Sequence, residues 1–162
     1  MFKKILRWLI EPPNRSLQSE IESLVSQIDF TNPQARISWK ISQVFGDQLT
    51  LLNLESSKVP VSGHYASAKF RGAILGTAVG LARVEGVESD REMLIDTIIY
   101  SFIYVYGERH GRNMSAATVE DFQTGDAEVI ASDWALEDFV QITTTNSVAS
   151  VSGVYLAGAG LL

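Results

Sequence analysis

The chain has 162 residues, of which 46% are hydrophobic and 20% are charged, and its formal net charge at pH 7 is −6. These proportions are ordinary for one globular domain, and a domain of this length buries enough surface to fold without disulfides. The negative charge argues against general nucleic-acid binding, which needs a basic surface. Because the chain contains no cysteine, disulfides, thiolate metal sites and cysteine nucleophiles are excluded.

The first segment, residues 1–13, has a basic and amphipathic pattern. A short helix is predicted over residues 2–10, and two prolines end it. One interpretation is contact with an anionic membrane or a partner, and the other is a first helix that packs on the core. The segment lacks the cleavage site of a signal peptide, so we expect a cytoplasmic protein, at the inner face of a membrane if the helix is an anchor. The candidate contact residues are Phe2, Lys3, Lys4, Arg7 and Trp8.

Several helices are then predicted in succession. Residues 17–30 carry a one-sided apolar stripe, which is typical of a helix with one buried face. Asn32 and Pro33 predict the N-cap and first position of the next helix, which Gly46 closes. Residues 48–55 predict a further short helix. The loop-forming composition of residues 56–63 then indicates a linker.

A glycine repeat marks the predicted helix within residues 64–84. Gly72, Gly76 and Gly80 recur every four residues and therefore share one helix face. Each glycine destabilises an exposed helix by about 1 kcal/mol relative to alanine, so a compensating contact is expected. We interpret the repeat as tight helix packing against residues 89–106, with membrane association or self-assembly as the alternatives.

The longest apolar helical pattern runs over residues 89–106. Ser89 and Glu92 predict a capping box at its start, and Gly107 predicts its end. Because apolar residues occupy nearly every face, this helix must be covered on all sides. We therefore predict an all-α single domain of about six helices, with residues 89–106 as the central helix.

The C-terminal third of the chain changes character twice. Gly107 and Gly111 predict a flexible basic turn, followed by helices that include an acidic one over residues 126–142. Residues 143–162 carry no charge and are rich in serine, threonine, glycine and valine, which predicts an irregular or extended tail. Such a tail would lie on its own domain or on a partner. The predicted organisation is an N-terminal segment over 1–13, a helical domain over 14–142 and a tail over 143–162.

Three polar residues are the candidates for chemistry. Asp96 lies inside the most apolar helix, where a carboxylate needs a cation or hydrogen-bond donors. Tyr100 follows it one turn later, and His110 is of a residue type used in acid–base catalysis, so an acid–base site or a small polar pocket is one interpretation. Structural pairing and solvated helix ends are the alternative interpretations. No phosphate-binding, zinc, calcium-loop or nucleophile motif occurs, so we expect no cofactor and no metal.

The sequence favours a non-enzymatic protein–protein interaction module, such as a bacterial adaptor, assembly factor or immunity-type protein. A protein partner or self-association is expected, and nucleic acid is not. The first alternative is a peripheral membrane protein anchored by the N-terminal helix. The second alternative is a small enzyme that uses Asp96 or His110.

Overall fold

The computed structural model describes residues 23, 26–125, 135–136 and 153–161. The chain divides into two compact units, Met1–Arg36 and Ile37–Leu162, which are described separately. The predicted contact residues Phe2, Lys3, Lys4, Arg7 and Trp8 lie outside the described residues, as do most of the helix expected over 17–30 and most of the acidic helix expected over 126–142.

The described part of the first unit leads into a capped helix. The Asn32 side-chain oxygen accepts a hydrogen bond from the Gln34 amide at 2.9 Å, immediately before helix α3, Pro33–Leu51. This contact satisfies one of the amides left free at a helix start. The N-cap predicted at Asn32 is therefore confirmed.

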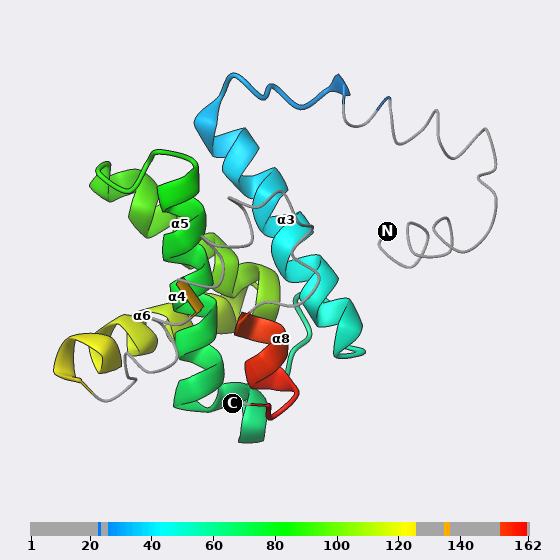
Figure 1. The fold of residues 1–162 in the computed structure, drawn as a ribbon, viewed down its shortest axis with the longest axis vertical. Helices are drawn as coiled ribbons and strands as arrows, with labels where there is room; N and C mark the ends of the chain where they lie inside the picture. The colour runs from blue at the N-terminus through cyan, green and yellow to red at the C-terminus, as the bar shows by residue number, and fades with distance from the viewer. Residues whose placement is uncertain (1–22, 24–25, 126–134, 137–152, 162) are drawn as a thin grey trace. The chain divides into compact units, whose positions relative to one another are not determined.

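The described residues of the chain form helices and connecting turns and contain no strand, which confirms the all-α prediction. Figure 1 shows the elements in chain order. After α3 they are the 3₁₀ turn η1 (Gly63–Ala66), α4 (Ala68–Val84), α5 (Arg91–Tyr106), α6 (Glu108–Thr124) and the short α8 (Gly153–Gly158).

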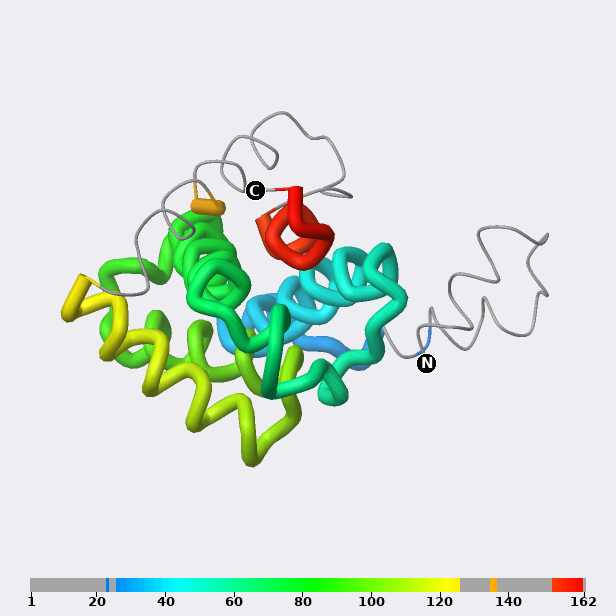
Figure 2. The backbone as a smooth tube through the Cα atoms, turned by 90° about the horizontal axis from the view of Figure 1, so that it is seen from below, coloured from blue at the N-terminus to red at the C-terminus, as the bar shows by residue number. Residues whose placement is uncertain are grey.

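Helix α4 occupies the centre of the second unit. Most of its apolar side chains are buried, those of Phe70, Ile74 and Leu81 fully, and it contacts η1, α5, α6 and α8. Figures 1 and 2 agree that α8 lies between α4 and α3. This helix, rather than α5, therefore organises the described core.

The prediction that residues 89–106 form the central helix is not confirmed. Helix α5 does cover this region, but Ile95 is 44% exposed and Tyr100 is 40% exposed. An apolar sequence therefore does not place a helix at the centre, because the neighbours decide which of its faces are covered. The N-cap also differs: the Asp90 carboxylate, rather than Ser89, accepts from the amides of Glu92 and Met93 at 3.0 and 3.1 Å.

Helices α5 and α6 form a hairpin with a one-residue connection. Gly107 reverses the chain with φ of 84°, a conformation that suits glycine. Gly111 then lies against α5, because a Cβ at this position would be 2.5 Å from the Ile103 Cα and 2.7 Å from the Phe102 carbonyl carbon. The flexible turn predicted around these glycines is therefore wrong: Gly107 alone makes the turn, and Gly111 serves helix packing.

Two further boundaries differ from the predictions. Helix α3 continues through Gly46, which is buried, and ends at Leu51. The tail predicted as irregular or extended over 143–162 is helical over Gly153–Gly158, and the rest of that range up to residue 152 lies outside the described residues. A six-residue helix is not stable alone. Its contacts with the domain therefore override the low helix propensity of the tail.

We predict that Gly111→Ala lowers the free energy of unfolding by about 1–3 kcal/mol or more, because the added methyl group meets backbone atoms that cannot rotate away. The expected loss is measured by urea unfolding monitored by circular dichroism. Asn113→Ala, an exposed change on the same helix, is the control and should leave stability nearly unchanged. Equal stability of both variants would contradict the close approach of the two helices.

Candidate functional site

The three polar candidates do not form one site. Asp96 is half-buried and Tyr100 is exposed on the same stretch of α5, one turn apart. His110 is exposed in the first turn of α6, beyond the far end of α5. Ten helical residues separate Asp96 from the end of α5, a distance of roughly 15 Å along the axis. The hairpin therefore keeps Asp96 and His110 apart, and a role for either residue alone stays a prediction.

His110 also lies in a different electrostatic setting from the one expected. The sequence suggested a helix C-terminus that favours positive groups, whereas α6 begins at Glu108. The positive end of the α6 dipole therefore faces His110. Glu108 compensates in that first turn, and its carboxylate accepts from the Arg112 Nε at 2.7 Å.

The tyrosines of α5 contact different neighbours. The Tyr104 hydroxyl donates to the Ser42 carbonyl of α3 at 3.2 Å, whereas the Tyr106 hydroxyl donates to the Tyr65 carbonyl of η1 at 2.5 Å. Burial raises the pKa of both hydroxyls above the ordinary value, and the positive charge of Arg71 offsets part of the pKa increase at Tyr106. Both phenols are therefore neutral hydrogen-bond donors that attach α5 to its neighbours.

The three glycines of the repeat lie within α4. Gly72, Gly76 and Gly80 are all buried in α4, and their packing against α5 in particular stays a prediction.

Among the described residues, no three histidine or carboxylate side chains gather closely enough to hold a metal ion. None of the helices in this part of the chain combines the length and hydropathy needed to cross a bilayer.

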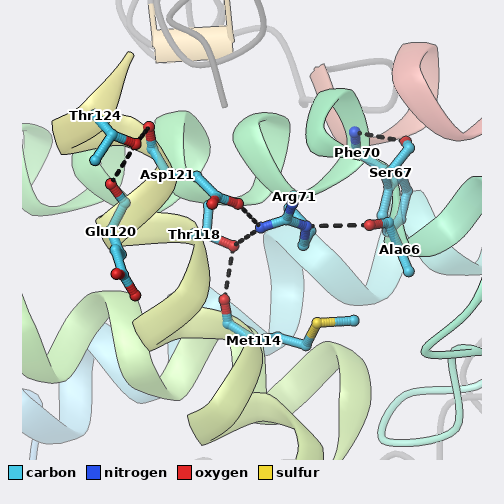
Figure 3. A network of polar contacts seen from close by, with 9 residues as sticks. All are labelled: Ala66, Ser67, Phe70, Arg71, Met114, Thr118, Glu120, Asp121 and Thr124. Carbon is cyan, nitrogen blue, oxygen red and sulfur yellow. Dashed lines mark hydrogen bonds and ion pairs between the residues drawn. The ribbon is translucent and has the colours of Figure 1, made fainter. Parts of the chain in front are cut away.

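A polar network joins α4 to α6 through Arg71 (Figure 3). The Arg71 Nη1 donates to the Thr118 hydroxyl at 3.0 Å and to the Asp121 carboxylate at 2.6 Å. Its Nε donates to the Ala66 carbonyl at 3.1 Å on the other side of the guanidinium. The Arg71 side chain is 14% exposed, so the fixed donors of the guanidinium are used for internal contacts. The network therefore connects α4 with η1 and α6 and has a structural role.

Helix α8 packs through apolar contacts against α4 and against Leu52, which follows the end of α3. Val154 and Ala157 are fully buried. A Cβ on Gly158 would lie 2.4 Å from the Leu52 Cδ1 and 3.1 Å from the Phe70 Cε2. The face of α8 toward the domain is therefore made of small or branched residues packed to contact distance.

Two polar side chains of the domain bond to the main chain of α8. The Gln48 Oε1 accepts from the Tyr155 amide at 3.0 Å, while its Nε2 donates to the Val44 carbonyl at 3.0 Å. The His64 Nε2 lies 3.0 Å from the Gly158 carbonyl. Because a carbonyl only accepts, the Nε2 of His64 carries the proton in this contact. We call Gln48, Leu52, His64 and Phe70 together the α8-binding surface.

The α8-binding surface was not singled out from the sequence. Gln48 lies in the segment predicted as a short helix over 48–55, and no motif surrounds His64. The available signal was the uncharged tail, which needs a surface to cover it. No family model matches the chain, and no curated protein and no solved structure matches it either. The proposed function therefore depends on the geometry of this surface.

We predict that Gln48→Met lowers the free energy of unfolding by about 1–3 kcal/mol, because it leaves the buried Tyr155 amide without its acceptor. Urea unfolding gives the magnitude, and hydrogen exchange should rise selectively over Gly153–Gly158. Gln123→Met, a change at an exposed glutamine of α6, is the control. Unchanged exchange in α8 would show that Gln48 does not hold this helix.

We predict a loss of stability at alkaline pH that depends on Tyr106. Its folded pKa is raised above the ordinary value of 10.0, so its contribution is complete below pH 10 and is lost as pH rises further, where the unfolded chain ionises first. Tyr106→Phe should make this decline shallower, by up to about 1.4 kcal/mol per pH unit. Urea unfolding between pH 8 and 11 measures the slope. Tyr100→Phe, at an exposed position of α5, is the control.

Proposed function

We propose that this protein is a non-enzymatic protein–protein interaction module that binds a short uncharged helix on the α8-binding surface. The observation that carries the proposal is the set of contacts made with α8. Gln48 and His64 form hydrogen bonds with the main chain of this short helix, and Phe70 packs against it. Docking of an apolar helix face on a complementary surface is a recurring mode of peptide recognition. In this protein the chain's own segment occupies the position of the ligand.

The energetics of α8 support exchange with a partner. A helix of six residues has little stability of its own, so its order comes from the surface that it covers. A segment of another protein with the same small buried residues would gain the same contacts. The tethered segment competes at an effective concentration on the order of millimolar, so an external helix binds measurably only when the tethered one is weakened.

The alternatives receive less support from the described residues. For an enzyme that uses Asp96 or His110, the α5–α6 hairpin holds the two residues apart, so each would have to act without the other. A membrane role would depend on the N-terminal residues around Trp8, which lie outside the described residues. Exposed apolar side chains such as Ile95 are compatible with partner contact of either kind.

We predict that the full chain with Val154→Asp binds a labelled peptide of residues 151–162, which carries two added lysines for solubility. Val154 is fully buried, so a carboxylate there releases the tethered helix. Fluorescence anisotropy should report binding at least about tenfold tighter than to the unaltered chain. The same peptide carrying Val154→Asp is the matched control and should not bind.

Circular dichroism of the Val154→Asp chain decides how a negative result is read. If the chain keeps its helical signal and binds no peptide, the proposal is wrong. If the helical signal is lost, the titration is repeated with the Gly158→Leu chain, in which the tethered helix is weakened by a steric clash and the α8-binding surface is unaltered. Absence of peptide binding to that folded chain would equally reject the proposal.

A further inference from the structure

The geometry points to a selection rule for the bound helix: the α8-binding surface accepts only a small residue at the position that Gly158 occupies. We infer that the partner is an uncharged helix with a branched residue, two variable residues and then a pair of small residues, as in Val154-Tyr155-Leu156-Ala157-Gly158. This inference rests on the proposed function and names the chemistry of its partner. Leu52 and Phe70 are the specificity-determining residues.

The steric limit is set by two side chains of unequal freedom. A Cβ at position 158 would meet the tip of Leu52 at 2.4 Å, and that flexible tip can rotate aside because Leu52 is only partly buried. The same Cβ would lie 3.1 Å from the Phe70 ring. Phe70 is fully buried, and its ring packs edge-on against Tyr65 with centroids 5.3 Å apart. One methyl group can therefore be accommodated, and a longer side chain cannot.

The polar contacts do not restrict the rest of the bound sequence. Gln48 and His64 bond to an amide and a carbonyl of the α8 backbone, which every residue except proline supplies. Tyr155 and Leu156 are half-buried and Ala159 is exposed, so these positions tolerate change. Sequence selectivity is thus concentrated at the positions of Val154, Ala157 and Gly158.

The test compares peptides of residues 151–162 on the full Val154→Asp chain. The wild-type peptide should bind, and Gly158→Leu should weaken it by about tenfold or more, because overpacking of a closed contact costs roughly 1–3 kcal/mol. Ala159→Leu, which places the same leucine side chain one residue later at an exposed position, should change the affinity less than twofold. Fluorescence anisotropy gives all three dissociation constants.

A second-site change separates steric selection from a general loss of helix binding. Leu52→Ala in the same chain removes the tip that meets position 158, so it should recover at least part of the affinity for the Gly158→Leu peptide. The wild-type peptide should not gain from this change, because its glycine leaves the new space empty. Rescue confined to the enlarged peptide would establish the role of Leu52.

The outcomes distinguish this inference from the proposed function. Equal binding of the wild-type and Gly158→Leu peptides would overturn the selection rule and leave helix binding intact. Equal weakening by Gly158→Leu and Ala159→Leu, or no rescue by Leu52→Ala, would also overturn it. Failure of the wild-type peptide to bind a folded chain would reject helix binding itself, and the selection rule with it.

Discussion

Close packing around α4 is the constraint on which the rest of this structure depends. Its large side chains, such as Phe70 and Ile74, fill the core, and its glycines are buried with them. In the described part of the chain, η1, α5, α6 and α8 pack against this one helix. Because so little of α4 remains exposed, each neighbouring element must be complementary in shape to the face of α4 that it covers. The packing of the described core therefore depends on this one helix.

Polar side chains then fix the positions of the elements around α4. Arg71 connects it to α6 through Thr118 and Asp121, and Gln48 connects α3 to α8. Buried polar groups of this kind are costly when they lose a partner, because the desolvated donor or acceptor stays behind. They contribute less to overall stability than to the choice of one arrangement among several apolar packings.

Helix α8 is the element on which the proposed function rests. It buries Val154 and Ala157 as a core element does, yet its polar contacts involve the backbone in the manner of a bound peptide. The contact of Gly158 with Leu52 and Phe70 gives the surface a means of choosing among helices. Under the proposed function, this segment completes the core in one state and gives way to a partner in another, because both states satisfy the same contacts.

The sequence by itself determined the all-α class, the N-cap at Asn32 and the helix end at Gly107, because periodicity, capping and glycine turns are local properties. Only the tertiary structure decided that α4 is central, that Gly111 serves packing and that part of the tail is helical. The candidate site could not be predicted, since Gln48, Leu52, His64 and Phe70 come together only when three elements pack. A six-residue helix such as α8 exists because its neighbours stabilise it, and no local pattern encodes that support.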